Sequence, residues 1–577
     1  MTPAEVRARI LEVTLQNGGH LASSLGAVEI ACALHEVFDP EKDRIVWDVG
    51  HQAYAWKILN GRNETFDTLR KLGGISGFPN PKESKADAAV AGHAGMAMSV
   101  ALGYAAARDQ KGTDEQVVAV VGDASMANGV SFEALNNVAN STKKLIVVLN
   151  DNEMSIGKPI GAFSKLLGKL ITGVTYNRIK AAAEETGHRL KLTFLREAYH
   201  QIESRIKGLF LANRYFEQFG LRYIGPIDGH DMDALRSAFT VAKNDKRSVL
   251  VHVVTKKGKG YEPAEQNPTK YHGISPKPTP NTEPRTPNHE PPTTVSWSDA
   301  FGQAVCELAR TDSRICALTA AMKDGTGLVN FAQEFPTRFF DVGIAEEHLL
   351  GFSAGLAAGG MRPIVAIYST FLQRAVDQVM HDLAITNLPV IIGVDRAGVV
   401  GADGVTHQGV YDLAMLRAIP NVVIAEPKDA PDLKALLQEA LARGGVTIIR
   451  YPRGTTPPAS VLPPATAFAG TTKYAVWSTG DWYLKAQAIA SRVNGIAVHA
   501  RYLKPIDESL LASQRAAGMK IISLENAAVI GGLGDAIKAD MKFGWPDEFI
   551  PHGTPTELEK KYTLDVDSIV ERIRQNG

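Results

Sequence analysis

Short, almost wholly apolar runs alternate with longer segments of helical spacing, and this alternation constrains the fold more than any other feature of the chain. The runs VVAVVG (117–122) and LIVVLN (145–150) flank VSFEALNNVANS (130–141), in which apolar residues recur at helical intervals. Strands buried on both faces are continuously apolar, and parallel strands need a crossover connection, usually a helix. The sequence therefore predicts βαβ units and parallel sheets with helices on both faces.

The same alternation occurs in three blocks of the chain. A stretch rich in Pro and Thr, 276–294, has no apolar periodicity and predicts a surface linker. A second break, TTPPASVLPP, begins at Thr455. Because 577 residues are too many for one core, we expect three doubly wound α/β domains. Their predicted bounds are 1–275, 295–456 and 457–577, with 276–294 as the linker.

Further expected elements complete these domains. Residues 161–219 are helical and mixed in polarity, which predicts an excursion from the first sheet. The second domain is expected to contribute strands PIVAIYS (363–369), PVIIGVDRAG (389–398), NVVIAEP (421–427) and TIIRYPRG (447–454), with helices over 371–385 and 430–443. The third is expected to contribute strands YAVWST (474–479), GIAVHARYL (495–503) and KIISLEN (520–526). VIGGLGDAI (529–537) is interpreted as strand–helix packing rather than a nucleotide site.

Composition excludes several classes of protein. Lys and Arg number 62, equal to Asp and Glu, so we expect no nucleic acid or anionic membrane as a partner. No apolar run reaches the ~18–20 residues that a membrane span needs. The cysteines, Cys32, Cys306 and Cys316, are too widely spaced for a metal or disulfide motif, so we expect them to be buried and reduced. The N-terminal residues contain no apolar signal segment, and we expect a cytoplasmic protein.

Oxygen-bearing side chains follow the ends of two predicted strands. Gly122-Asp123 ends one apolar run, and Asn150-Asp151-Asn152 ends the next. Ligands bind at the carboxyl ends of strands in open α/β sheets, and Mg²⁺ takes hard oxygen ligands together with substrate phosphates. Either half alone is commonly a turn, but the pair within one βαβ unit predicts a magnesium diphosphate site. Its expected ligands are Asp123, Asn152 and the backbone carbonyl of Met154.

A loop of small residues supports this prediction. AGHAG (91–95) leads into a segment of helical spacing, and a helix N-terminus offers free N–H groups to an anion. Glycine-rich helix starts are more often packing devices, so the loop is weak support by itself.

Longer motifs resemble a known family over nearly the whole chain. The matching stretches, in order, are GGHLASSLG (18–26), WDVGHQAY (47–54), LNDNEMSI (149–156), TKKGKGYEPAE (255–265), YHG (271–273), DVGIAEEH (341–348), IYSTFLQRAVDQ (367–378), DRAGVVGADGVTHQG (395–409) and YPRG (451–454). Together they resemble the 1-deoxy-D-xylulose-5-phosphate synthases, which are thiamin diphosphate enzymes with a transketolase-like fold. Ala124 departs from the usual Gly-Asp-Gly but leaves the metal ligands in place.

The resemblance implies a reaction and a set of cofactor-binding residues. Pyruvate would be joined to D-glyceraldehyde 3-phosphate with loss of CO₂, giving 1-deoxy-D-xylulose 5-phosphate for isoprenoid, thiamin and pyridoxal synthesis. The cofactors would be thiamin diphosphate and Mg²⁺, and the family's folds are homodimers. The implied cofactor-binding residues are His51, Gly92, His93, Ala94, Gly122, Asp123, Ala124, Asn152, Ile156, Lys257, Glu346, Phe371 and Arg374. Ile156 would bend the cofactor, although core packing is the default interpretation of any apolar residue.

Glu346 is the expected partner of a cofactor ring nitrogen. It lies among apolar and small residues, where a carboxyl group can stay protonated or share a proton. Taken alone, Glu346 and Glu347 would be acids favoured by a helix dipole in its first turn. The family motif selects Glu346 and not Glu347. By resemblance, Phe371 stacks on the aminopyrimidine, with Arg374 nearby.

The phosphorylated aldehyde brings about two negative charges to a neutral protein. Arg396 and Arg453 both follow predicted strands of the second domain, and arginine binds phosphate oxygens with a planar fork of donors. A surface ion pair is the commoner fate of one arginine, but two arginines at strand ends favour a phosphate clamp.

Histidines are the expected proton carriers. By resemblance, His20 and His272 contact the pyruvate-derived group and the aldehyde, while His407, with Asp403 and Tyr368, lines the acceptor site. A lone histidine is more often structural, so these residues are weighed with their motifs.

Three alternatives fit the sequence less well, since WDVGHQAY (47–54) and YPRG (451–454) match the synthases better than transketolase. A transketolase proper would use a ketose donor and need polar groups for several hydroxyls. The thiamin-dependent component of pyruvate dehydrogenase would need no phosphate clamp. A non-catalytic thiamin-binding protein could keep the fold, although Glu346 and the metal ligands are all present.

Overall fold

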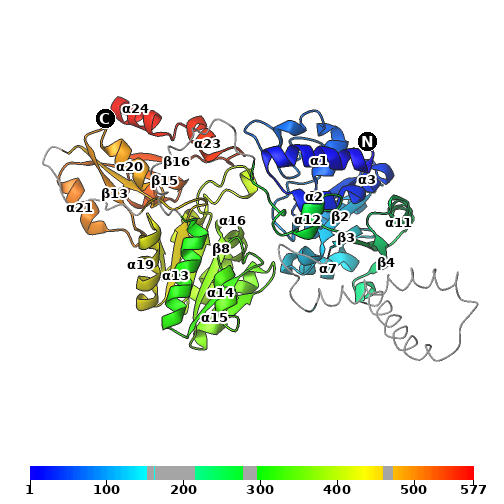
Figure 1. The fold of residues 1–577 in the computed structure, drawn as a ribbon, viewed down its shortest axis with the longest axis horizontal. Helices are drawn as coiled ribbons and strands as arrows, with labels where there is room; N and C mark the ends of the chain where they lie inside the picture. The colour runs from blue at the N-terminus through cyan, green and yellow to red at the C-terminus, as the bar shows by residue number, and fades with distance from the viewer. Residues whose placement is uncertain (153–161, 163–214, 277–294, 459–471, 577) are drawn as a thin grey trace, which may run out of the picture. The chain divides into compact units, whose positions relative to one another are not determined.

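The computed structural model describes residues 1–152, 162, 215–276, 295–458 and 472–576 (Figure 1). The chain divides into two compact units, Met1–Pro280 and Asn281–Gly577. The predicted linker 276–294 lies outside the described residues except for Pro276, as does most of the predicted excursion 161–219. The three-domain division stays a prediction.

The first unit is built on a five-stranded, wholly parallel sheet in the order β1-β2-β3-β5-β4. Its strands are β1 Arg44–Trp47, β2 Val117–Gly122, β3 Ile146–Asp151, β4 Leu221–Asp228 and β5 Ser248–Val254. Its helices are α1 Pro3–Asn17, α2 Leu21–Gly26, α3 Val28–Val37, α4 Tyr54–Lys57, η1 Ile58–Arg62, η2 Phe66–Thr68, α5 Met96–Lys111, α6 Asp123–Met126, α7 Gly129–Ser141, α11 Met232–Asn244 and α12 Glu262–Gln266.

Both faces of this sheet are buried. Along β2, Val118 and Val120 pack with α1, α3 and α11, whereas Ala119 and Val121 pack with α5 and α7. Successive side chains of a strand point to opposite faces, so a continuously apolar run serves two cores at once. The predicted strands 117–122 and 145–150 and the helix between them are confirmed.

The second unit contains two sheets. Seven strands are ordered β14-β10-β11-β9-β8-β6-β7, and four are ordered β13-β12-β15-β16. The strands are β6 Ile315–Thr319, β7 Phe339–Asp341, β8 Arg362–Tyr368, β9 Ile391–Asp395, β10 Val422–Ala425, β11 Val446–Tyr451, β12 Tyr474–Ser478, β13 Gly495–His499, β14 Tyr502–Lys504, β15 Lys520–Ala528 and β16 Met541–Trp545. All pairings are parallel except that of β14 with β10.

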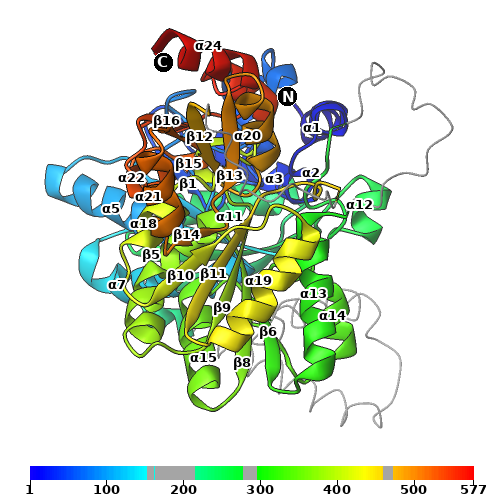
Figure 2. The same ribbon diagram turned by 90° about the vertical axis from the view of Figure 1, so that its left-hand side faces the viewer.

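Helices cover these two sheets as the sequence predicts for an α/β fold. They are α13 Trp297–Thr311, α14 Val329–Glu334, α15 Glu346–Ala358, α16 Ser369–Leu372, η3 Gln373–Ala375, α17 Val376–Gln378, η4 Val379–Ala384, η5 Gly404–Thr406, α18 Asp412–Arg417, α19 Ala430–Arg443, α20 Tyr483–Ala490, α21 Glu508–Ala516, α22 Leu533–Ala536, α23 Pro555–Lys561 and α24 Val566–Asn576. Figure 2 shows α13 and α19 lying across β9 and β11, where their apolar faces form one core. The predicted α/β class with doubly wound parallel sheets is confirmed.

Two expected elements differ from prediction. The helix expected over 371–385 is broken into α16, η3, α17 and η4, because Ala375 leaves helical geometry at φ −116° and ψ 23°. The single strand expected over 495–503 is two strands in two sheets, since the chain leaves β13 at His499 and pairs β14 antiparallel with β10. Apolar periodicity alone does not indicate which sheet a short apolar segment joins.

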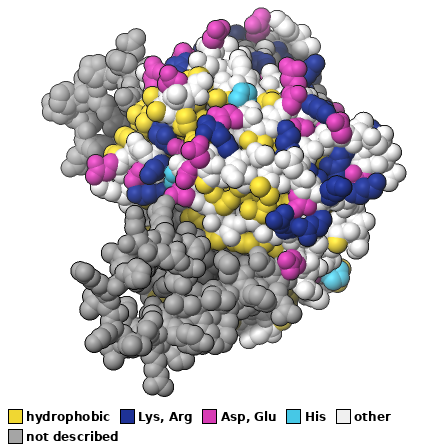
Figure 3. Space-filling view, turned by 90° about the vertical axis from the view of Figure 1, so that its right-hand side faces the viewer, with side chains coloured by type: hydrophobic (Ala, Val, Ile, Leu, Met, Phe, Trp, Pro, Cys, Tyr) yellow, Lys and Arg dark blue, Asp and Glu magenta, His cyan; other side chains and the backbone are white. Residues whose placement is uncertain are grey.

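The surface and the cysteines agree with the composition. Basic and acidic side chains intermingle on the face shown in Figure 3. Cys32, Cys306 and Cys316 are buried and unbridged, as expected, and burial raises the pKa of Cys32 and of Cys316 to about 11. Within the described ranges, no helix combines the length and the hydrophobicity that crossing a bilayer requires.

Candidate active site

The ends of β2 and β3 lie side by side in the first unit. Gly122 pairs in register with Asn150, so Asp123 and Asn152 both leave the sheet at the same edge. Asp123 is buried, and burial followed by the charge of Asp151 raises its pKa to about 8. A carboxyl group in this state is favoured as an anion only when a cation is nearby.

The donor set at this edge suits a hard cation that keeps phosphate ligands. It offers one carboxylate and one amide oxygen, and no group of three or more His, Cys, Asp or Glu side chains in the described part of the chain is arranged to hold a metal. Mg²⁺ fits this pattern because it needs few protein carboxylates. The predicted ligand Met154 and the predicted cofactor contact Ile156 lie outside the described residues.

Three predicted histidines form a cluster in the same unit. The ring centroid of His20 lies 6.0 Å from that of His51 and 5.8 Å from that of His272, and the last two are 5.4 Å apart. Desolvation, followed by neighbouring positive charges that include Lys257, holds the pKa of His51 and of His272 well below the ordinary value. These two imidazoles are therefore neutral near pH 7 and can accept a proton.

Lys257 joins the histidine cluster to the strand edge. Burial lowers its pKa to about 8, and the charge of Asp123 opposes that shift. The charge of Lys257 also lowers the pKa of His51 and of His272. The predicted residues of the first unit that are close enough to interact electrostatically are therefore His20, His51, Asp123, Lys257 and His272. A cation at this place would partly neutralise a diphosphate.

The loop before α5 differs from the anion site expected of it. The N–H groups of Gly95 and Ala97 donate to the carboxylate of Asp48, at 3.0 and 2.9 Å. Asp48 is 1% exposed and lies one residue beyond β1. The expectation of free donors is therefore wrong for these two groups, because a buried acid from WDVGHQAY already caps the helix. Asp48 thereby anchors the start of α5, directly after Gly92, His93 and Ala94.

In the second unit, Glu346 is the first residue of α15 and is 4% exposed. Burial raises its pKa, and the guanidinium of Arg374 opposes the shift by donating from Nη1 to Oε2 at 3.1 Å. Arg374 stands in the 3₁₀ turn η3, which follows directly after the short helix α16 that carries Phe371. The break in the expected helix thus falls at a predicted cofactor contact.

An aromatic stack continues from Phe371. Tyr368 and Phe371 are stacked with centroids 5.6 Å apart, and His407 meets Phe371 edge-on at 5.8 Å. The guanidinium carbon of Arg396 lies 4.2 Å from the centre of the Tyr368 ring. A cation held over an aromatic face keeps its edge donors available for an anion.

Arg396 and Arg453 follow neighbouring strands. In the pairing of β9 with β11, Asp395 is opposite Tyr451, so both arginines leave the sheet at one edge. Arg396 has a φ of 60°, a left-handed conformation that is costly for a non-glycine residue and recurs at functional sites. Arg453 faces Asp403 at 3.6 Å with 43% of its side chain exposed. Such an exposed pair is worth less than about 1 kcal/mol, so Asp403 competes only weakly with a phosphate for the Arg453 guanidinium.

Sequence reasoning missed a buried series of hydrogen-bonded side chains beside this strand edge. His252 Nε2 lies 2.9 Å from Asp151 Oδ2, and its Nδ1 lies 2.7 Å from the Tyr223 hydroxyl. The three residues come from β3, β5 and β4, and no local pattern joins them. The hydrogen bond from His252 orients the carboxylate of Asp151, which lies next to the predicted metal ligand Asn152.

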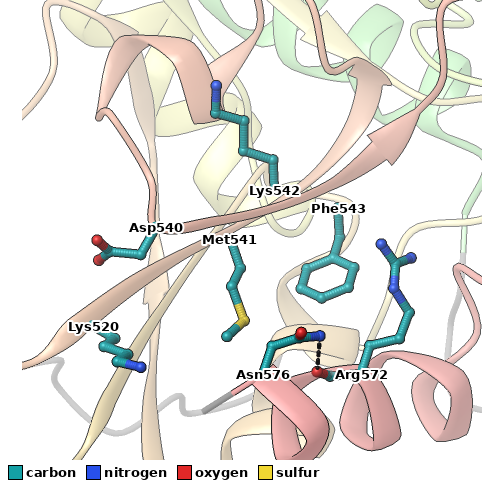
Figure 4. A pocket seen from close by; sticks show the side chains of 7 residues that line it. All are labelled: Lys520, Asp540, Met541, Lys542, Phe543, Arg572 and Asn576. Carbon is teal, nitrogen blue, oxygen red and sulfur yellow. Dashed lines mark hydrogen bonds between the residues drawn. The ribbon is translucent and has the colours of Figure 1, made fainter.

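A hollow of about 450 Å³ lies elsewhere, beside the edge strand β16 and helix α24 (Figure 4). It is lined by Lys520, Asp540, Met541, Lys542, Phe543, Arg572 and Asn576. None of these is a predicted site residue, and the Arg572 guanidinium carbon lies 4.7 Å from the centre of the Phe543 ring.

Comparisons with known proteins agree with the motifs. Residues 2–255 match the family described as 1-deoxy-D-xylulose-5-phosphate synthase, and residues 293–458 match the transketolase pyrimidine-binding domain. The synthase 1 of Geobacter metallireducens is 44% identical, covering 99% of this chain and 95% of the relative. That of Desulforudis audaxviator is 44% identical, covering 98% and 93%. A solved transketolase from Campylobacter jejuni is 16% identical over 99% of this chain and 98% of its own, with a TM-score of 0.46.

The parallel α/β sheets and the matched pyrimidine-binding domain define a thiamin diphosphate enzyme of the transketolase class. Relatives that are more than 40% identical along nearly the whole length narrow this class. The chain belongs to the 1-deoxy-D-xylulose-5-phosphate synthase family.

Proposed function

We propose that the protein joins pyruvate to D-glyceraldehyde 3-phosphate with release of CO₂, forming 1-deoxy-D-xylulose 5-phosphate. Family membership supports the reaction. The observation that carries the acceptor assignment is the pair Arg396 and Arg453, which follow adjacent strands at one sheet edge beside Tyr368 and His407. Two permanent cations at one edge suit the phosphate of the aldehyde.

When bound, thiamin diphosphate supplies a nucleophilic carbon and an electron sink. In this proposal Asp123 and Asn152 would hold Mg²⁺, and Lys257 and His51 would contact the diphosphate. The fit rests on the buried Asp123, whose raised pKa a divalent cation would reverse, and on the His51 Nδ1 atom, which is buried without a hydrogen-bond partner. Glu346 and Phe371 would hold the aminopyrimidine.

Glu346 is proposed to control a proton on the pyrimidine ring. Its carboxyl group is buried, so its protonated form is favoured, while Arg374 supports the ionised form. A group held between these two influences can share a proton with a ring nitrogen at little cost. Arg374 also fixes the direction of the carboxyl group.

Histidines are proposed to move protons on the substrates. His272 and His20 would contact the pyruvate-derived group and the aldehyde, and His407 would act at the acceptor hydroxyls with Asp403. Neutral imidazole accepts a proton at one nitrogen and donates from the other, which suits both attack on a carbonyl and product release.

The first test is CO₂ release from pyruvate by the purified protein with Mg²⁺ and thiamin diphosphate. We expect release to depend on D-glyceraldehyde 3-phosphate and to give a five-carbon phosphorylated product. Turnover of a ketose phosphate donor without use of pyruvate would identify a transketolase instead. Bound cofactor without turnover of either donor would favour the non-catalytic alternative.

We further propose a cytoplasmic homodimer. The dimer is supported by the homodimeric folds of the family, and the cytoplasmic location by three buried cysteines that form no disulfide. Light scattering coupled to gel filtration should give twice the 62.1 kDa chain mass. A monomeric mass with full activity would contradict the dimer.

A further inference from the structure

The segment Gly398–Gly409, here called the acceptor loop, is closed at its base by its own backbone. Gly398 and Gly409 exchange two hydrogen bonds, at 2.7 and 2.8 Å. Within the loop, Gln408 Oε1 accepts from the N–H of Val400 at 2.8 Å and from that of Gly401 at 3.3 Å. The loop is therefore a fixed structure, and it carries the proposed acceptor residues Asp403 and His407.

The acceptor loop also holds one of the phosphate-binding arginines. Arg453 Nη1 donates to the carbonyl oxygen of Val400 at 3.3 Å and faces Asp403 at 3.6 Å. The position of the Arg453 guanidinium thus depends on where the backbone at Val400 lies.

Asn526, the seventh residue of β15 in the other sheet of this unit, contacts the loop at the adjoining residue. Its Oδ1 accepts from the N–H of Val399 at 3.1 Å, and its amide is so close to Gly398 that a Cβ there would lie 2.1 Å from Nδ2. Gly398 has a φ of 83°, so a side chain at this position would be both strained and obstructed.

Asn526 is itself held from three sides. Its side-chain Oδ1 accepts from Trp545 Nε1 at 2.8 Å, and its side-chain Nδ2 donates to Asp481 Oδ2 at 2.6 Å. Its backbone carbonyl oxygen accepts from Arg450 Nη2 at 3.4 Å. The residue as a whole is 8% exposed. An amide with this many partners has one orientation, and it imposes that orientation on the N–H of Val399.

We infer that Asn526 is a positioning residue for the phosphate of the acceptor: through Val399 and Val400 it sets the place of Arg453. The inference rests on the proposed function, because it assumes that Arg453 binds the aldehyde's phosphate. It assigns the four-stranded sheet of the C-terminal part a role in acceptor specificity.

The test compares two acceptors in steady-state kinetics with saturating pyruvate, thiamin diphosphate and Mg²⁺. Asn526→Leu keeps the volume of the side chain but removes both polar atoms. We expect it to raise the KM for D-glyceraldehyde 3-phosphate about tenfold, the loss expected when a hydrogen bond that supports a charged contact is removed. The kcat/KM for unphosphorylated D-glyceraldehyde should stay within about twofold of wild type. That acceptor makes no use of Arg453, and the loop's own hydrogen bonds, between Gly398 and Gly409 and from Gln408, remain to hold Asp403 and His407.

A matched control exists in helix α21, where Gln514 bonds to Trp477 of the same four-stranded sheet. Gln514 Oε1 accepts from Trp477 Nε1 at 2.7 Å, so it is another buried amide that receives an indole N–H. Gln514→Leu removes the same kind of hydrogen bond without touching the acceptor loop. It should lower stability by less than Asn526→Leu does, because one side-chain hydrogen bond is lost rather than three, and it should leave both KM values unchanged.

Exchanging the two polar partners provides a rescue. In the double variant Asn526→Asp with Asp481→Asn, a carboxylate accepts from Val399 and Trp545, and an amide donates back to it, so net charge and hydrogen bonds are both kept. We expect the KM for the phosphorylated aldehyde to return to within about threefold of wild type. If Asn526→Leu does not fold, Asn526→Ser, whose side chain is too short to reach Val399, takes its place.

The outcomes separate the inference from the proposed function. A wild-type enzyme that uses the two aldehydes equally would overturn the phosphate clamp and the proposed acceptor. A wild-type enzyme that strongly prefers the phosphorylated aldehyde, together with an Asn526→Leu variant that keeps this preference, would overturn the inference alone. Equal losses with both acceptors would show a general structural role and would also overturn it.

Discussion

Replacing Glu346 by glutamine tests the centre of the proposed chemistry. The two side chains have nearly the same shape, so the packing of a residue that is 4% exposed is retained. What changes is the ability to hold or share a proton, because an amide does not titrate. Arg374 Nη1, which donates to Glu346 Oε2 at 3.1 Å, can donate to the amide oxygen instead.

The size of the effect follows from two contributions. A hydrogen bond between a charged group and its partner is worth about 1.5–3 kcal/mol, so the affinity for thiamin diphosphate should fall roughly 10- to 150-fold. Loss of a positioned proton donor or acceptor reduces rates by about 10²–10⁴. We therefore expect kcat to fall by at least about a hundredfold even when the cofactor is saturating.

Two assays separate these contributions. Isothermal titration with thiamin diphosphate in the presence of Mg²⁺ gives the affinity, and CO₂ release at saturating cofactor gives kcat. Glu347→Gln is the matched control, since Glu347 is the next residue of α15 and makes no part of the proposed site. A Glu346→Gln enzyme that kept more than a third of the wild-type kcat would refute the proton assignment, whatever its affinity.

The remaining predictions concern the metal, the helix cap and the buried charges. Asp123→Asn should weaken Mg²⁺-dependent binding of thiamin diphosphate at least about tenfold, because a charged oxygen ligand is lost. Chelation of the metal should weaken cofactor binding by the wild-type protein in the same way. An unchanged affinity of the variant in isothermal titration would contradict the metal site. Asp48→Ala should lower the unfolding free energy of the first unit by about 1–2 kcal/mol, since the N–H groups of Gly95 and Ala97 lose their acceptor, and an unchanged midpoint in urea would show that water replaces it. Arg450→Met should cost the second unit about 3–5 kcal/mol at pH 7, because Arg450 is 1% exposed and its partner Glu426 would be left buried without a counter-charge; the loss should shrink at pH 5, where a carboxyl of raised pKa takes a proton, and an equal loss at both pH values would argue against this cause. Burial lowers the pKa of His499 to about 4 from 6.5, so its contribution to stability is present above pH 6.5 and is lost as pH falls towards 4, by roughly 3 kcal/mol at most; His499→Gln should flatten the urea midpoint over this range, and an unchanged slope would exclude His499 as its source.

Elements with a strong local pattern could be predicted from sequence. The helix expected over 430–443 has exactly those bounds as α19, because Asp429 caps its first turn, Pro431 suits that turn and Gly444 follows its end. The strands β2 and β3 were predictable because their apolar runs are continuous. The break in the helix expected over 371–385 could not be predicted, because no Gly or Pro lies near Ala375 to indicate it.

The candidate site could be predicted only where a motif carries it. The clustering of His20, His51 and His272 and the common edge of Arg396 and Arg453 follow from residues in matched motifs. The contacts that support them come from residues far apart in sequence. Asn526 lies 127 positions from Val399, and no periodicity or local composition indicates that the two will meet.

The short strand β14 limits how the chain could be divided. Residues 502–504 lie well beyond the predicted boundary at 457, yet they form the outer edge of the seven-stranded sheet by pairing with β10. A gene encoding only 295–456 would yield a sheet whose edge strand β10 exposes unpaired backbone groups, a template for aggregation. Fission or recombination of such genes would therefore preserve 295–576 as one heritable module, whereas a break between the two compact units would leave every described sheet whole.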